Sequence, residues 1–126
     1  MFEIKNITKA YNKNTFKAVD SLSLTVNNGE IFGFLGPNGA GKTTTIRMLT
    51  GILQPDEGDL LLDDISILTR PIAAKRTFAF VPDNPETFSR LKAMEYLNFI
   101  ADVYKLSPED KKERIDYYCS KFGMLE

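Results

Sequence analysis

The stretch GPNGAGKT, residues 36–43, satisfies the pattern G-x-x-x-x-G-K-[ST] and decides what the rest of the chain can be. Its glycines lack a Cβ, so the loop can turn tightly and direct consecutive backbone N–H groups at an anion. A helix that begins beside Gly41 would add the positive end of its dipole. Lys42 supplies a mobile positive charge, and the Thr43 hydroxyl is a ligand for Mg²⁺. The stretch therefore predicts a site for a di- or triphosphate.

The residues on either side of this loop supply the context that the motif requires. An apolar run over residues 30–35 predicts a buried strand, and residues 41–53 predict a helix that ends at Pro55 and Gly58. A glycine-rich turn without a ligand is the alternative, and the flanking elements argue against it. The predicted phosphate-binding residues are Gly36, Pro37, Asn38, Gly39, Ala40, Gly41, Lys42, Thr43 and Thr44.

The composition excludes several other kinds of site. Sixteen basic residues against 17 acidic ones give a formal charge of −1, so we expect no nucleic-acid partner and no global attraction to an anionic membrane. The chain has no histidine and a single cysteine, Cys119, which excludes zinc sites, His-based acid/base pairs and internal disulfides within these residues. No apolar run reaches the about 18 residues that cross a bilayer. With no signal-peptide pattern at the N-terminus, we expect a cytosolic protein.

The remaining N-terminal segments predict an antiparallel layer attached to an α/β core. Residues 1–30 favour strands, with a period-two alternation from Leu22 to Val26 and a turn at Asn28-Gly29. Further along the chain, we expect short strands at residues 59–63 and 77–81 and a short helix at residues 70–76.

Two amphipathic helices are predicted towards the C-terminus. Apolar residues recur every three or four positions from Leu91 to Tyr104. Ser107-Pro108-Glu109-Asp110 then predicts the start of a helix that runs to about Phe122, with a capping serine and acids in the first turn. On this second helix we expect Ile115, Cys119 and Phe122 to face the core and Lys111, Lys112 and Arg114 to lie on a solvated face.

These residues together resemble the ATP-binding subunit of ABC transporters, from the first residue of the chain to the last. The run NNGEIFGFLGPNGAGKTTTIRMLTGIL, residues 27–53, is similar to the family's longer stretch around the phosphate loop. The resemblance implies an α/β fold: a RecA-like P-loop NTPase core with an N-terminal antiparallel β layer and the beginning of a helical subdomain. The implied parts of this single, incomplete domain are the β layer at 1–30, the loop strand and helix at 31–54, strands and a Q-loop-like segment at 55–90, and the helical subdomain from 91 to 126.

The resemblance also implies two ligand-binding residues outside the loop. Tyr11 matches the family's A-loop aromatic, which stacks on the adenine ring; the alternative is a residue of the core or of the sheet edge. The segment FAFVPDNPE, residues 78–86, is similar to the family's Q-loop, whose polar residue contacts Mg²⁺ and the attacking water. Asp83 stands where the family usually has Gln, and an acid here occurs in branches that resemble drug or sodium exporters. A turn acid between two prolines is the alternative.

These matches assign the chemistry to few residues. Lys42 and Asp83 are the implied catalytic residues, and Thr43 and Asp83 are the implied metal ligands. The run Leu60-Leu61-Leu62-Asp63-Asp64 has the apolar-then-Asp pattern of a Walker B strand, but it follows Lys42 too closely for the family. We therefore assign it to the antiparallel layer, where it ends in a turn. The family commonly has Gly at the second position of this turn, and Asp64 departs from that pattern.

By resemblance, the parent protein binds Mg²⁺ and ATP and hydrolyses ATP to drive a separate transmembrane permease. It would pair head-to-tail with a second ATP-binding subunit and lie peripherally on the inner face of the cell membrane. The family's signature motif, Walker B strand, D-loop and switch His would follow Glu126, so we expect these residues to bind ATP with negligible turnover. The alternatives are a soluble non-transport ABC-type ATPase, a non-hydrolysing nucleotide-binding module, or another phosphate-loop enzyme such as a small-molecule kinase or a GTPase.

Overall fold

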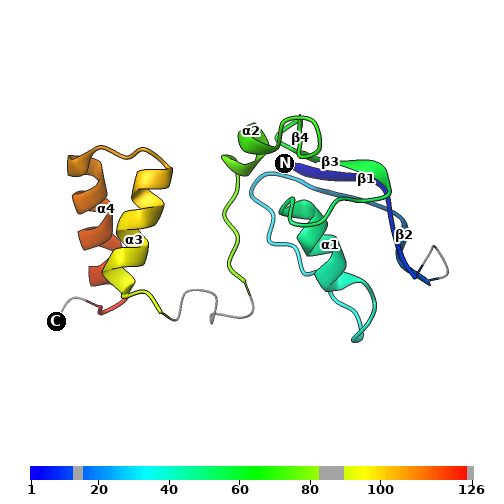
Figure 1. Ribbon diagram of the computed structural model, residues 1–126, viewed down its shortest axis with the longest axis horizontal. Helices are drawn as coiled ribbons and strands as arrows, with labels where there is room; N and C mark the ends of the chain where they lie inside the picture. The colour runs from blue at the N-terminus through cyan, green and yellow to red at the C-terminus, as the bar shows by residue number, and fades with distance from the viewer. Residues whose placement is uncertain (13–15, 83–89, 125–126) are drawn as a thin grey trace. The chain divides into compact units, whose positions relative to one another are not determined.

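The computed structural model describes residues 1–12, 16–82 and 90–124. The chain divides into two compact units, Met1–Val81 and Pro82–Glu126 (Figure 1). The first unit contains the sheet and the phosphate loop, and the second contains a pair of helices.

The first unit is built on a four-stranded sheet with the strand order β2-β1-β3-β4. All of its neighbouring strands are antiparallel, which confirms the predicted antiparallel layer. Strand β1 pairs on one side with β2, from Phe2 opposite Val26 to Tyr11 opposite Phe16, and on its other side with β3. The strands are β1 (Phe2–Tyr11), β2 (Phe16–Val26), β3 (Glu57–Leu62) and β4 (Ile65–Ser66).

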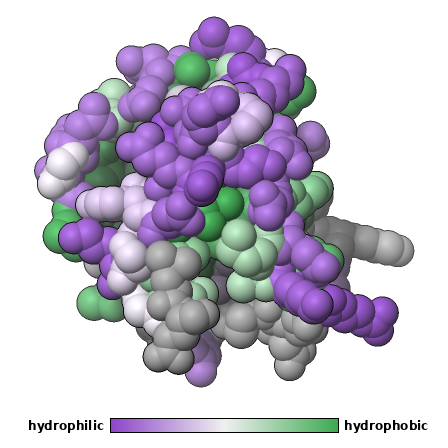
Figure 2. Space-filling model, turned by 90° about the vertical axis from the view of Figure 1, so that its left-hand side faces the viewer, coloured by the Kyte–Doolittle hydropathy of each residue, from purple (hydrophilic) through white to green (hydrophobic). Residues whose placement is uncertain are grey.

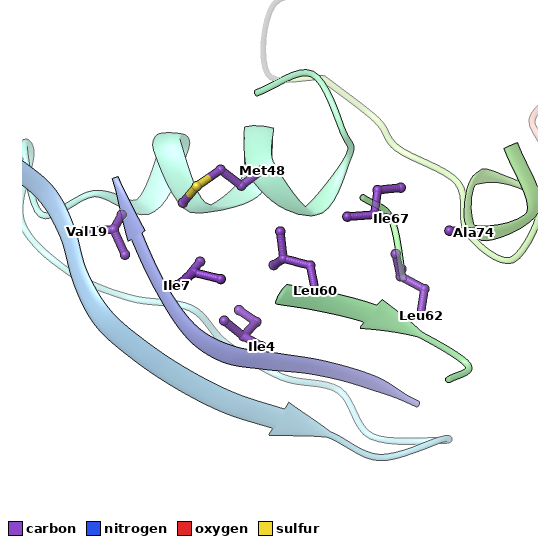
Figure 3. Packing of buried hydrophobic residues seen from close by; sticks show 8 residues of the cluster. All are labelled: Ile4, Ile7, Val19, Met48, Leu60, Leu62, Ile67 and Ala74. Atoms are coloured by element: carbon purple, nitrogen blue, oxygen red, sulfur yellow. The ribbon is translucent and has the colours of Figure 1, made fainter. Parts of the chain in front are cut away.

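The helix α1 (Lys42–Leu49) packs against this sheet and closes the hydrophobic core (Figure 3). Ile4 and Ile7 of β1, Leu60 of β3 and Met48 of α1 are fully buried in it. Burying each such side chain stabilises the folded state by about 1.5–3 kcal/mol. The core therefore holds the first turn of α1 at a fixed place against the β1–β2 hairpin.

Helix α1 is shorter than the sequence predicts. It ends at Leu49 rather than near Leu53, because Gly51 adopts a left-handed φ of 67°. The amide of Gly51 then donates to the carbonyl of Met48, and the amide of Ile52 donates to the carbonyl of Arg47. This is the hydrogen-bonding pattern of a Schellman motif, which satisfies the last carbonyls of a helix and turns the chain away.

Two of the predicted strands do not form. Residues 30–35 and 77–81 have no assigned strand structure, and in the part of the chain that the structure describes no strand pairs with either segment. The side chains of Phe32 and Phe34 line a cavity of about 140 Å³ against the sheet and α1. Ile31 and Leu35, in contrast, are 104% and 91% exposed. The alternation of a strand is present, but a strand also needs a neighbour to receive its backbone hydrogen bonds.

The predicted short helix and the predicted strand after α1 are confirmed in the first unit. Residues 71–75 form the short helix α2 (Pro71–Lys75). The β3–β4 turn carries Asp63 and Asp64, both with left-handed φ values, 47° and 60°. The Asp63 carboxylate pairs with the amino group of Met1 at 2.6 Å, which ties the turn to the start of β1.

The second unit contains α3 (Ala93–Val103) and α4 (Pro108–Lys121). The hydroxyl of Ser107 accepts the hydrogen bond of the Asp110 amide at 3.1 Å, which confirms the predicted N-cap. Cys119 is buried, as predicted, whereas Phe122, which was also expected to face the core, is 76% exposed at the C-cap of α4. The face on the side of α4 is mainly hydrophilic, with smaller hydrophobic areas between the polar side chains (Figure 2). Among the described residues no helix has the length and apolar character to cross a membrane.

One predicted surface residue of α4 is placed differently. Lys111 is half-buried rather than solvated, and its ammonium group pairs with the carboxylate of Asp102 on α3 at 2.7 Å. Its stem lines an apolar groove of about 580 Å³ between α3 and α4, together with Ile100 and Cys119. A lysine at the edge of such a groove can cover apolar surface with its methylene groups while its charge stays near water. Arg114 also lines this groove, although it is exposed.

Candidate functional site

The predicted phosphate loop is an exposed turn that leads directly into α1. Gly39 and Gly41 have φ values of 84° and 85°, which are readily available to glycine and costly for other residues. The Ala40 amide donates to the Pro37 carbonyl at 3.2 Å and closes the turn. Gly41 is the N-cap of α1 and contributes no side-chain cap. Within residues 1–12, 16–82 and 90–124 the N–H groups of residues 42–44 have no hydrogen-bond partner, so they can bind an anion.

The loop is held in place by a close contact between Gly41 and β2. A Cβ built on Gly41 would lie 2.3 Å from the carbonyl oxygen of Ala18 and 3.1 Å from Cγ2 of Val19. The strand register passes from Lys9 opposite Val19 to Ala10 opposite Lys17, so Ala18 is the extra residue of a β-bulge. The bulge and Gly41 approach so closely that only glycine fits. The sequence carries no signal for this contact, because a bulge is defined by the pairing of two strands.

The side chain of Lys42 folds back over the loop. Its ammonium group donates to the carbonyl of Pro37 at 2.7 Å and also to the carbonyl of Gly36. These bonds hold the positive charge within the turn, next to the first amides of α1. In this position Lys42 contributes the charge that an anionic ligand of the loop would need.

The threonines after Lys42 have different surroundings. The Thr43 side chain is exposed, and its hydroxyl has no hydrogen-bond partner within residues 1–12, 16–82 and 90–124. Thr45 is buried, and its hydroxyl donates to the Gly41 carbonyl at 2.9 Å. Thr43 is therefore available to a ligand, whereas Thr45 stabilises the helix start.

A magnesium ion fits this donor set only together with a phosphate ligand. Among the described residues no cluster of three or more His, Cys, Asp or Glu side chains could hold a metal ion. The Thr43 hydroxyl is a single hard oxygen donor, and Mg²⁺ commonly takes one or two protein oxygens and completes its shell with phosphate oxygens and water. Asp83, the other predicted metal ligand, lies outside the described residues.

Tyr11 lies at the end of β1, directly opposite Phe16 at the start of β2. Its side chain is 41% exposed, so it is not part of the hydrophobic core. Ala18, whose carbonyl lies against Gly41, is two residues from Phe16 along the same strand. The structure thus brings this end of the hairpin and the phosphate loop to the same side of the first unit. The adenine-stacking role of Tyr11 stays a prediction.

Two lysines near this end of the hairpin form ion pairs, one with a residue of β2 and one with the residue that precedes β3. Lys17 donates to Asp20 at 2.8 Å, and this hydrogen bond raises the pKa of Lys17 and lowers that of Asp20. Asp56 accepts from the backbone amide of Ala10 at 2.8 Å and from the ammonium group of Lys9 at 2.7 Å. These two bonds, the first above all, hold the pKa of Asp56 below its ordinary value. The cation that lies on the loop itself is Lys42.

The Walker B alternative for Asp63 does not fit this geometry. Leu60, Leu61 and Leu62 lie in β3, which is antiparallel to both of its neighbours. Asp63 follows in the β3–β4 turn, where its carboxylate pairs with the Met1 amino group. The assignment of this run to the antiparallel layer is confirmed.

Comparisons with known proteins point to a single family. A family model described as ABC transporter matches residues 19–126. The chain is 39% identical over 126 residues to the SkfA peptide export ATP-binding protein SkfE of Bacillus subtilis, and the match covers all of this chain and 51% of the relative. It is 38% identical over 123 residues to the lipopolysaccharide export system ATP-binding protein LptB of Haemophilus influenzae, covering 95% of this chain and 50% of the relative.

Solved structures lead to the same result. A structure titled "Structure of ATP binding subunit of ABC transporter" superposes with a TM-score of 0.86 at 27% identity, over 98% of this chain and 51% of the other. The fold is therefore that of the P-loop NTPase domains of ABC proteins, as the sequence predicts. The chain spans about half the length of the curated relatives that it matches.

Proposed function

The chain belongs to the ABC transporter family, and from this premise we propose that the protein binds Mg²⁺ and ATP through residues 36–44. The observation that carries the proposal is the close approach of Gly41 to the Ala18 carbonyl. A Cβ added to Gly41 would lie only 2.3 Å from the Ala18 carbonyl oxygen. This contact fixes the start of α1, whose first amides have no hydrogen-bond partner in the described part of the chain. A di- or triphosphate is the ligand that such an arrangement binds best.

Each loop residue has a separate part in binding. The backbone amides at the start of α1 would bind the β-phosphate oxygens, since the helix dipole favours negative charge there. The ammonium group of Lys42 would exchange its bonds to the Gly36 and Pro37 carbonyls for stronger, charge-assisted bonds to phosphate. Tyr11 would stack on the adenine ring.

The magnesium ion would be held by the Thr43 hydroxyl and by the phosphates. When bound, Mg²⁺ neutralises part of the phosphate charge and orients the terminal phosphoryl group. Asp83 would assist at the same ion and at the attacking water. The exposed Thr43 hydroxyl, which has no partner in the described part of the chain, supports this role.

For the whole protein, we propose an ATPase that drives a separate transmembrane permease. It would act with a second ATP-binding subunit and lie on the inner face of the cell membrane through its partner. The names of SkfE and LptB, which are ATP-binding proteins of export systems, support this role. Because phosphoryl transfer depends on many groups positioned together, residues 1–126 alone would hydrolyse ATP negligibly.

Isothermal titration calorimetry of the 126-residue chain tests the binding proposal. We expect saturable binding of Mg²⁺ and ATP that is weakened at least about tenfold in Lys42→Ala, since a charge-assisted hydrogen bond contributes about 1.5–3 kcal/mol. Lys112→Ala, which removes an exposed lysine of α4, is the matched control and should bind as the unchanged chain does. Folded protein that releases no heat, or Lys42→Ala with unchanged affinity, would disprove the proposal.

A further inference from the structure

Two large aromatic side chains stand opposite each other at the end of the β1–β2 hairpin. Tyr11 is the last residue of β1 and Phe16 the first of β2, and they are direct partners in the strand register. Directly opposed residues of an antiparallel pair lie on the same face of the sheet, with Cβ atoms about 4.5–5.5 Å apart. Tyr11 and Phe16 therefore present their rings on one face of the hairpin.

The core does not account for Phe16. Its side chain is 55% exposed, although Phe2, Phe34 and Phe78 of the same unit are partly buried against the core cluster or the cavity beside it. This exposure leaves the side chain accessible from water, so its ring is available to a flat ligand.

The aromatic pair lies close to the phosphate loop. Phe16 is two residues from Ala18 on β2, and two residues of strand span about 7 Å. The Ala18 carbonyl in turn lies against Gly41, the residue at which α1 begins. A ligand with its phosphates at Gly41 and its sugar directed towards the hairpin end would bring its base to Tyr11 and Phe16.

From this juxtaposition we infer that Phe16 is a second base-binding residue of the nucleotide site, paired with Tyr11. The inference rests on the proposed function, because it takes the phosphates to be held at residues 36–44. One ring of the pair stacks on the base and the other packs beside it, so that the base contacts a platform wider than a single ring. Such a platform offers no hydrogen bond to the edge of the base, and it therefore binds adenine and guanine alike.

The test compares ligands with and without a base, by calorimetry on the 126-residue chain. Its three probes are the magnesium complexes of ATP, GTP and inorganic tripolyphosphate. The variant Phe16→Ala removes the ring, and Phe16→Tyr restores it in a similar shape. Phe99→Ala is the matched control, because Phe99 is 54% exposed and lies on α3 in the other unit.

We expect Phe16→Ala to weaken the binding of ATP and of GTP by about fivefold to tenfold, which is the lower part of the range for base–aromatic stacking. Its affinity for tripolyphosphate should be unchanged. Phe16→Tyr should bind all three probes as the unchanged chain does, and so should Phe99→Ala.

The results that would overturn the inference differ from those that would overturn the proposed function. Phe16→Ala with unchanged affinity for ATP, or with an equal loss for tripolyphosphate, would show that Phe16 does not contact the base. If the unchanged chain binds ATP no more tightly than tripolyphosphate, the base makes no favourable contact with Tyr11 or Phe16, and the inference is wrong. The proposal that residues 36–44 bind phosphate would not be affected by that result. If the unchanged chain binds neither ligand, the proposed function itself is wrong.

Discussion

The close approach of Gly41 to β2 predicts a large and specific cost for a single methyl group. In Gly41→Ala the new Cβ would lie 2.3 Å from the Ala18 carbonyl oxygen, a separation that carbon and oxygen atoms do not sustain. The φ of 85° adds about 1–2 kcal/mol of left-handed strain for a non-glycine residue. Relieving the overlap requires the loop or the bulge to move, which typically costs a further ~1–3 kcal/mol.

The variant Gly39→Ala separates these two contributions. Gly39 has nearly the same φ, 84°, but a Cβ built there meets no described atom within 4 Å. Gly39→Ala should therefore lose only the left-handed strain, about 1–2 kcal/mol, whereas Gly41→Ala should lose about 2–5 kcal/mol.

Urea unfolding of both variants without nucleotide, followed by circular dichroism, measures the difference. If the two variants lose equal stability, Gly41 does not rest on the Ala18 carbonyl, and the inference that β2 positions the phosphate loop is refuted. If Gly41→Ala loses more stability, its nucleotide affinity should also fall, because the start of α1 would have moved.

Two further predictions concern residues outside the loop. Asp64→Gly should raise the free energy of unfolding by about 0.5–1 kcal/mol, because Asp64 has a left-handed φ of 60° that glycine adopts without strain; urea unfolding that shows lower stability would contradict this. The variant Asp56→Asn tests a dependence on pH. The hydrogen bond from the Ala10 amide, and then that from Lys9, lowers the pKa of Asp56 in the folded state. The Asp56 carboxylate therefore stabilises the fold above the ordinary pKa of 3.8, and this stabilisation is lost as the pH falls through the lower pKa of the folded state. Asp56→Asn should therefore be less stable than the unchanged chain at pH 7, and the difference should shrink in thermal unfolding below about pH 4; a difference that is constant with pH would contradict this.

The local signals in the sequence predicted much of this fold correctly. The strand β2 of the antiparallel layer follows from the alternation from Leu22 to Val26, and α4 follows from its capping Ser107. These features depend on residues that are near one another in the chain. The motif at residues 36–43 also predicted the exposed glycine-rich turn and the helix that follows it.

The errors arose where a structure depends on partners that the local sequence does not specify. Residues 30–35 and 77–81 have the apolar pattern of strands, but hydrophobicity predicts burial and says nothing of which strand lies alongside. The periodicity of α4 predicts a solvated Lys111, because it does not reveal that Asp102 of α3 lies within reach. The sequence does not predict the contact between Ala18 and Gly41 for the same reason, since this contact joins a β-bulge to a distant loop.

The central claim is that the amides of the glycine-rich loop and the ammonium group of Lys42 bind phosphate. Two-dimensional amide NMR spectra of the chain, recorded during titration with magnesium and ATP, test this claim most directly. We expect the largest shifts on the amides from Gly39 to Thr44, and we expect these shifts to be lost in Lys42→Ala. Shifts that are confined to α3 and α4, or a folded chain whose spectrum does not change at saturating nucleotide, would contradict it.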